Sequence, residues 1–415
     1  MFKILFFCFL FLNPIFSRST EAVSIGKKRL KNGMLLLYSN EHSDDKTVVV
    51  SVFLRNGSTL KYMDKTGFTV LSREFLSSRI NEIAKKEGFR YKTTESWDYI
   101  SYIFYLPIEF LKERSDKLWQ ALFASSEDDE IEFQNFKNKI IHRIELDNRQ
   151  KFVRFPLISF MTPNRSVYSS GIYGNSDDVA SIGKKEFNGF LSCYSNPNNA
   201  VLVVSGLKNP SMLADKISKY KPCFMSEKYS NENKTVFNVP QRSVNFVRSW
   251  NAGVLVRLGF ISSECGSKKS VVYDVISKII EQDVEINKLC SAVNVYNDCM
   301  SSGGVMEIVL SLDPKANADD VVDQVVSRIK RVLTAPSAKV LARSKEEITD
   351  SFLRNINDRE TLVYILGKAE ISAKSYINVP DYLEKINAVK IEDIKSAART
   401  LSPENMCRVF VKMEG

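Results

Sequence analysis

Two histidines set the limit on metal chemistry in this chain of 415 residues. His42 and His142 lie a hundred residues apart, and neither has a second histidine near it. An H-x-x-E-H segment would place two imidazoles on one helical face to hold zinc, with the glutamate as general base. The sequence contains no such segment, and no C-x-x-C pair or Gly-rich phosphate loop. It therefore argues against zinc-dependent peptide hydrolysis by this chain alone, and we assign no catalytic residue.

The strands and the helix that would hold such a zinc site can nevertheless be predicted from residues near the N-terminus. Residues 30–33 read Leu-Lys-Asn-Gly, residues 48–53 form an apolar strand, and residues 55–58 read Arg-Asn-Gly-Ser. Apolar residues at helical spacing predict a helix over 66–86, which begins at a Thr-Gly pair and stops at Gly88.

This order resembles the opening of pitrilysin/insulinase-family metallopeptidases, whose Gly-led helix carries H-x-x-E-H. The three aligned positions here are Val70, Arg73 and Glu74. Val70 has no donor atom, and Arg73 puts a fixed positive charge where the general base should be. The resemblance implies two similar α/β domains that enclose a peptide chamber, in a member whose zinc motif is degenerate.

Active members of the family take a third zinc ligand, a glutamate, from a later helix that aligns with residues 133–146. The expected position falls on or near Arg143. His142 and Glu145 are i, i+3 neighbours there, and together with Glu74 they form a trio that can in principle bind a metal weakly. The alternative, which we favour, is a solvated or salt-bridged helix face.

The resemblance also implies a substrate-holding arginine and tyrosine in the second domain. Tyr296 is the candidate for the tyrosine, and the arginine position falls on Cys290. Lys288 is a poor substitute because it lacks the planar guanidinium fork. The alternative is that Tyr296 packs within a strand.

An internal repeat predicts the domain organisation. Residues 181–204 and 388–411 both read as an amphipathic helix, a Pro-x-Asn turn and an apolar strand, with Phe187 matching Ile394 and Pro197 matching Pro403. The predicted fold class is α+β, with two tandem homologous α/β domains. The predicted segments are a signal peptide at 1–22, a first domain at 23–220, a polar linker at 221–242 and a second domain at 243–415.

The first residues predict export. Lys3 precedes an apolar run over 4–16, and Ala22 is the expected cleavage point. The chain would then be periplasmic or secreted, and the alternative is an uncleaved membrane anchor. No later stretch reads as a transmembrane span. The net charge is +9, but the basic residues are scattered, so a nucleic-acid surface is not indicated.

Cysteine spacing leaves the redox state open. Six widely spaced cysteines follow the signal peptide, and Cys290 with Cys299 is the closest pair in sequence. An oxidising compartment would permit disulfides, and the alternative is buried free thiols.

Four functions are consistent with these features. The first is the non-catalytic subunit of a heterodimeric zinc peptidase, which would contribute to a peptide-binding chamber while zinc resides in the related partner subunit. The second is a structural scaffold subunit, like the core proteins of the respiratory cytochrome complex. The third is a peptide-binding module that does not cleave, and the least favoured is a residual metalloendopeptidase.

Overall fold

The computed structural model describes most of the chain: residues 24–40, 46–123, 130–149, 157–162, 168, 171–222, 243–249, 253–375 and 381–414. The predicted signal peptide lies outside these residues, as do His42, Cys223 and most of the predicted linker. Among the described helices, none has the length and apolar character that crossing a bilayer requires.

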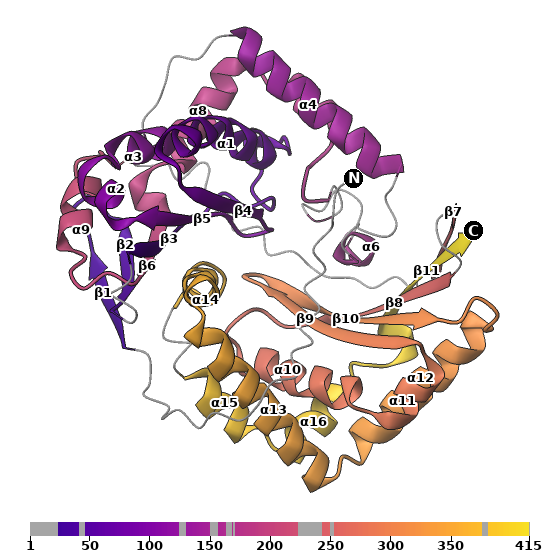
Figure 1. Cartoon of the computed structure of the whole chain (residues 1–415). Helices are drawn as coiled ribbons and strands as arrows, with labels where there is room; N and C mark the ends of the chain where they lie inside the picture. Colours follow the sequence, from indigo (N-terminus) through magenta and orange to yellow (C-terminus); the bar gives the residue numbers. More distant parts are fainter. Residues whose placement is uncertain are drawn as a thin grey trace.

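The first half builds a six-stranded sheet (Figure 1). Its strands are β1 (Ile25–Arg29), β2 (Leu35–Ser39), β3 (Thr47–Leu54), β4 (Arg90–Glu95), β5 (Ile100–Pro107) and β6 (Ala200–Ser205), in the order β1-β2-β6-β3-β5-β4. The central strands β3 and β6 are apolar and buried on both faces, whereas β4 at the edge alternates between exposed and half-buried residues. The sheet is therefore covered on both sides, and β4 is an open edge.

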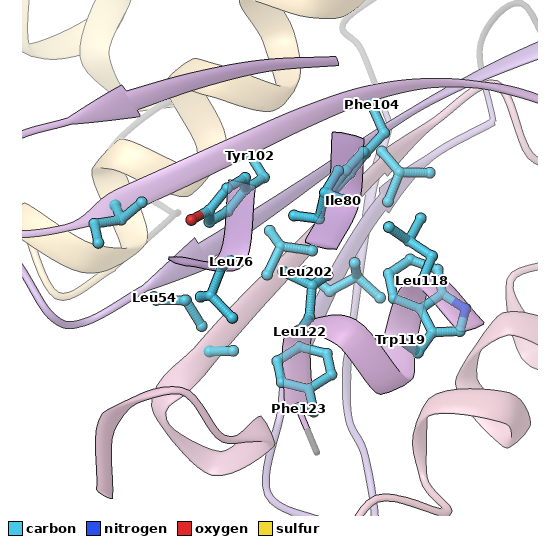
Figure 2. Packing of buried hydrophobic residues seen from close by; sticks show 14 of the residues in the cluster. Leu54, Leu76, Ile80, Tyr102, Phe104, Leu118, Trp119, Leu122, Phe123 and Leu202 are labelled. Carbon is cyan, nitrogen blue, oxygen red and sulfur yellow. The ribbon is translucent and has the colours of Figure 1, made fainter. Parts of the chain in front are cut away.

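Helices cover one face of this sheet. They are α1 (Phe68–Glu87), α2 (Ile108–Glu113), α3 (Asp116–Phe123), α4 (Glu130–Arg149), α7 (Ser176–Ser181), α8 (Lys184–Tyr194) and α9 (Ser211–Ile217), with the short α6 (Ile158–Met161) lying nearer the second half. Figure 2 shows the core between α1, α3 and the strands, where Leu76 and Ile80 of α1 meet Tyr102 and Phe104 of β5. This packing fixes α1 against the sheet and thereby sets the position of Val70, Arg73 and Glu74.

Glycine starts α1 for a steric reason. Gly67 has a φ of 92°, in the left-handed region, and a Cβ there would lie 2.3 Å from Cγ2 of Val179. Only glycine meets both demands without strain. The hydroxyl of the neighbouring Thr66 makes two hydrogen bonds. It donates to Oδ2 of Asp178 at 2.7 Å and accepts from the backbone amide of Asn175 at 3.0 Å. The start of α1 is thus tied to the loop that precedes α7.

The second half builds a five-stranded sheet in the order β7-β11-β8-β10-β9. Its strands are β7 (Ser243–Ser249), β8 (Gly253–Ser262), β9 (Ala292–Met300), β10 (Gly303–Leu312) and β11 (Met406–Glu414). Its helices are α10 (Lys268–Glu281), α11 (Val284–Leu289), α12 (Ala318–Thr334), α13 (Ala338–Asn357), α14 (Arg359–Ser372), α15 (Tyr382–Ala388) and α16 (Ile391–Ala398). In Figure 1 these helices gather on one side of the second sheet, except α14.

The two halves share one topology, and the predicted fold class is confirmed. The strand order β6-β3-β5-β4 in the first sheet matches β11-β8-β10-β9 in the second. Phe187 on α8 and Ile394 on α16 are both buried in their cores. Each is followed by a 3₁₀ turn that begins at proline, at Pro197 and Pro403 respectively, and then by a central strand. The predicted domain boundaries remain a prediction, since most of residues 221–242 lies outside the described part of the chain.

Helix α14 crosses from the second half to the first. Its apolar residues pack on the face of the first sheet opposite α1, against residues that include Phe53 and Tyr99 (Figure 1). A Cβ on Gly367 would lie 2.0 Å from the ring of Phe53, so glycine lets the helix approach this closely. The hydroxyls of Tyr99 and Tyr364 lie 2.8 Å apart and add a polar contact.

One disulfide joins Cys265 to Cys299. The sequence singled out Cys290 and Cys299 as the closest pair, and that pair does not form. The reason is strand β9, which begins just after Cys290 and ends just after Cys299, so the extended chain holds the two about 30 Å apart. Cys265 instead precedes α10 and lies beside the far end of β9, where its amide donates to the carbonyl of Met300 at 2.8 Å.

Candidate functional site

The three positions aligned with a zinc motif lie on the buried side of α1. Val70, Arg73 and Glu74 have exposed fractions of 1%, 9% and 8%. Val70 is part of the apolar core beneath the helix. Arg73 and Glu74 are charged groups in a place that admits little water, so each needs a partner.

Glu74 is surrounded by cations. Arg73, its neighbour in sequence, donates from Nη2 to Oε1 of Glu74. From α4, Nζ of Lys139 lies 2.8 Å from Oε2, and Nη1 of Arg143 lies 3.6 Å from Oε1. Lys139 and Arg143 are i, i+4 neighbours, which places both on the helical face that packs against α1.

A second carboxylate completes the network. Nε of Arg73 forms an ion pair with Oε2 of Glu95, at the end of the edge strand β4. Arg143 donates from Nη2 to the hydroxyl of Tyr173 at 2.9 Å, and its guanidinium lies 4.7 Å from the centre of the tyrosine ring. Three cations thus face two carboxylates, and the cluster carries a net positive charge.

The pKa values of the two carboxylates, Glu74 and Glu95, shift in opposite directions. Burial alone would raise the pKa of Glu74, but the hydrogen bond from Lys139 and the charges of Arg73, Lys139 and Arg143 together lower it. Burial dominates at Glu95 and raises its pKa, although Arg73 and Arg143 oppose the shift. Glu74 is consequently held as a carboxylate, which Lys139 and the two arginines stabilise.

These side chains do not fit zinc. A catalytic zinc site needs three donor side chains and an open position for water. Val70 and Arg143 offer no lone pair to a metal, and the oxygens of Glu74 are already taken by cations. The ion pairs place positive charge at the positions predicted to align with a zinc motif, and no hydrolytic step can be derived from this donor set.

The residual metal trio does not assemble. His142 and Glu145 lie on exposed positions of α4, whereas Glu74 is buried against the cations of the same helix. Within the described residues, no three His, Cys, Asp or Glu side chains gather closely enough to hold a metal ion.

Tyr296 lies on the edge strand β9 and is 47% exposed. Its cross-strand neighbour is Glu307 on β10, and it lines a hollow of about 560 Å³. It is therefore not a core packing residue. Lys288 forms an ion pair with Glu285 at 2.9 Å. Cys290 is half-buried, and burial raises the pKa of its thiol to about 11.

Sequence reasoning missed three members of the network, Glu95, Lys139 and Tyr173. One signal was available for Lys139, since its spacing from Arg143 puts two cations on one turn of a predicted helix. Glu95 and Tyr173 come from a strand edge and a loop, and only the tertiary structure brings them to Arg73 and Arg143.

Known proteins of this fold are numerous. No family model matches the sequence. The uncharacterized zinc protease YmxG of Bacillus subtilis is 21% identical over 322 residues, which cover 71% of this chain and 74% of that protein.

Solved structures match more of the chain. A protease from Helicobacter pylori superposes with a TM-score of 0.79 at 16% identity, over 94% of this chain and 100% of that one. A chain of complex III2 from Candida albicans superposes with a TM-score of 0.77 at 14% identity, over 94% of this chain and 96% of that one. A peptidase M16 inactive domain from Pseudomonas fluorescens superposes with a TM-score of 0.76 at 12% identity, over 95% of this chain and 99% of that one. The resemblance to the pitrilysin/insulinase family is confirmed, and the chain has the fold of this family of peptidase-like proteins.

Proposed function

We propose that this chain is the exported, non-catalytic subunit of a two-chain peptidase of the pitrilysin/insulinase type. The observation that carries the proposal is the ion-pair network at Arg73, Glu74 and Arg143. It lies at the positions that align with a zinc motif, where only Glu74 has a donor atom for zinc, and cations already hold both of its oxygens. A fold of the peptidase type without a set of zinc ligands at these positions is what we expect of a supporting subunit.

The proposed role is to supply part of a peptide-binding chamber. A related subunit would hold the zinc, and the four domains of the pair would enclose a peptide substrate. Tyr296 is the residue proposed to contact substrate, since it is exposed beside a hollow. Closing two such subunits together would cover apolar surface that a monomer rarely leaves open beyond a few hundred Å².

A structural scaffold role is the second candidate. It is supported by the similarity to a chain of complex III2 from Candida albicans. A scaffold subunit would keep the same fold without contacting peptide, so the two candidates differ in whether a peptidase activity accompanies the chain.

Co-purification from the native source separates these candidates. The chain should elute together with a related subunit that contains H-x-x-E-H, identified by mass spectrometry, and the fraction should cleave unfolded peptides. The zinc chelator 1,10-phenanthroline should abolish this cleavage, because the metal resides in the partner. Recovery of this chain alone, or in a larger complex without peptidase activity, would contradict the proposed role, and the latter result would favour the scaffold.

A further inference from the structure

The hairpin turn between β9 and β10 of the second half contacts the first half. The backbone amide of Ser301 donates to Oδ2 of Asp98 at 2.9 Å, and its hydroxyl donates to Oδ1 at 2.7 Å. The hydroxyls of Ser302 and Tyr168 lie 2.6 Å apart. Asp98 belongs to the turn between β4 and β5, so corresponding hairpin turns of the two repeats meet here.

Asp98 also accepts a hydrogen bond from α14. The hydroxyl of Ser372, the last residue of that helix, donates to Oδ2 at 2.6 Å. One carboxylate of the first half thus accepts three hydrogen bonds from two elements of the second half. The position of the β9–β10 turn is therefore coupled to the contact between the halves.

The disulfide between Cys265 and Cys299 fixes the strand that leads into this turn. Cys299 lies two residues before Ser301, and Cys265 lies in the segment between β8 and α10. The corresponding positions of the first repeat, three residues before α1 and one residue before the end of β4, are Lys65 and Thr94. The first repeat forms the same strands and helix without a crosslink at this place, so the disulfide is a particular feature of the second half.

Both cysteines line a hollow of about 390 Å³ between α10, α13, α14 and α15. Each of the two is partly exposed. Much of the remaining wall is apolar and includes Val271, Phe352 and Ile365. The volume falls within the range of small-molecule sites, so a small thiol can reach the disulfide without unfolding of the chain.

Two of the charged groups on this wall are engaged within the chain. Asp274 accepts from Nδ2 of Asn297 at 2.8 Å and from the hydroxyl of Tyr382 at 2.9 Å. Lys278 forms an ion pair with Glu347 at 3.5 Å. The disulfide, in contrast, presents sulfur atoms that a thiolate can attack.

We propose that the disulfide between Cys265 and Cys299 is a thiol-exchange site, reached through the hollow, whose reduction by a small dithiol loosens the contact between the halves at Asp98. A thiolate of the dithiol bonds to one cysteine sulfur and displaces the other as a thiolate, which takes up a proton. The second thiol then displaces the first cysteine from the mixed disulfide. The chain gains two electrons and two protons and carries two thiols, while the dithiol becomes a cyclic disulfide.

The coupling acts in both directions. The crosslink holds the end of β9 beside the segment before α10 and so holds Ser301 at Asp98. By linkage, the hydrogen bonds at Asp98 keep the two cysteines together and favour the disulfide. A crosslink that stabilised the second half alone would not respond to a change at Asp98 in the first half.

This site goes beyond the proposed subunit role. It lies within a single chain, and its test needs neither a partner nor zinc. Its failure would leave the proposed function standing, and failure to find a partner would leave this site standing.

Hydrogen exchange of the full mature chain provides the first test, before and after treatment with dithiothreitol in the absence of denaturant. We expect the two cysteines to become alkylatable, and exchange at the amide of Ser301 to rise by about tenfold or more. The amides of β3, in the core of the first half, should stay protected over the same labelling time in both forms. Unchanged exchange at Ser301, loss of protection in β3, or a disulfide that is reduced only in denaturant would each overturn the proposal.

The thiol–disulfide equilibrium provides the second test, measured in buffers of defined reduced to oxidised dithiothreitol. Asp98→Asn should shift the equilibrium towards the two thiols by about fivefold or more, since it weakens the contact that favours the disulfide. Ser301→Ala removes only the hydroxyl donor and should give a smaller shift of the same sign, which keeps the test decisive if Asp98→Asn fails to fold.

Two matched controls accompany these variants. Asp215→Asn is an exposed change of the same kind on α9, and Cys290→Ser removes a free thiol just before β9. Both should show the equilibrium of the unmodified chain. An equilibrium that is unchanged in Asp98→Asn and in Ser301→Ala would show that the disulfide is not coupled to the contact between the halves, and the proposal would be wrong.

Discussion

Nζ of Lys139 lies 2.8 Å from Oε2 of Glu74, so an ammonium group from α4 lies beside the carboxylate at the last of the three positions that align with a zinc motif. Arg73 and Arg143 approach the other oxygen of the same carboxylate. The network holds α1 to α4 through charge. These contacts assign Arg73, Glu74 and Arg143 a part in holding the two helices together.

Glu74→Gln should destabilise the chain by about 2 kcal/mol at pH 7, because it removes one of the two carboxylate partners of the buried Arg73 and the partner of the more exposed Lys139 and Arg143. The folded-state pKa of Glu74 is lowered, so its contribution to stability is present above the unfolded value of about 4.5 and is lost as the pH falls through the folded value. Urea unfolding at pH 7, 5, 4 and 3 should show a difference between the variant and the unmodified chain that is equal at pH 7 and 5 and shrinks at pH 4 and 3.

The matched control for Glu74 is Glu82→Gln, an exposed position on the same helix, where the change should stay within about 0.5 kcal/mol. Equal stability of the Glu74 and Glu82 variants would show that the network contributes nothing to folding.

Asp274→Asn should raise the free energy of unfolding at neutral pH, whereas Glu74→Gln should lower it. Burial raises the pKa of Asp274 to about 6, against the usual 3.8. A carboxyl group with a raised folded pKa favours folding below its unfolded value, and this advantage is lost as the pH rises through the folded value. Asparagine carries no charge to desolvate, and the hydroxyl of Tyr382 can accept from its amide. The charged and titratable side chains that line the same hollows as Asp274 are Lys278 and Glu281 on α10, Tyr296 and Asp298 on β9, Glu307 on β10, Glu347 on α13, Lys368 on α14, and Tyr382 and Lys385 on α15.

The variant should therefore be more stable than the unmodified chain by about 3 kcal/mol at pH 8. The two should converge below pH of about 4, where Asp274 is protonated in both the folded and the unfolded state. Thermal melts across this range measure the difference. A variant that is less stable at pH 8 and does not converge would show that the hydrogen bonds of Asp274 outweigh its desolvation.

The disulfide between Cys265 and Cys299 gives a prediction about the compartment as well as the fold. Non-reducing peptide mapping of the native protein should recover the two cysteines in one linked pair. Reduction should lower the free energy of unfolding by about 3 kcal/mol, since the bond closes a loop of 34 residues. Free thiols at both positions in freshly isolated protein would argue against export to an oxidising compartment.

Limited proteolysis tests the predicted boundary between the halves. The first cuts should fall within residues 221–242, where a polar, Pro-containing sequence predicts an exposed connection. The resulting fragments should stay associated under native conditions, because α14 packs on the first sheet. Early cutting within Phe68–Glu87, with residues 221–242 intact, would place the boundary elsewhere.

The sequence predicted the repeat because its signal is local. A helix with one deeply buried apolar residue, a proline-led turn and a strand are features of consecutive residues, and Phe187, Pro197, Ile394 and Pro403 lie where the pattern expects them. The start of α1 was equally readable, since Gly67 marks it in sequence and in space.

Long-range features could not be predicted in the same way. Lys139 is 65 residues from Glu74 along the chain, and no pattern in either segment indicates that the two side chains come into contact. Helix α14 was missed because its apolar side is completed by the sheet of the other half, and Gly367 lowers its helix propensity. The hollow at Asp274 arises from how α10, α13 and β9 pack, which no single motif encodes.

Metal content is the most direct test of the central claim, that an ion-pair network has replaced the zinc site. The mature chain, purified without a partner and dialysed against buffer containing a small excess of zinc and then against metal-free buffer, should be analysed by atomic emission. The network at Arg73, Glu74 and Arg143 predicts far less than one zinc per chain, unchanged in Glu74→Gln. About one tightly held zinc per chain, lost in Glu74→Gln, would contradict the account.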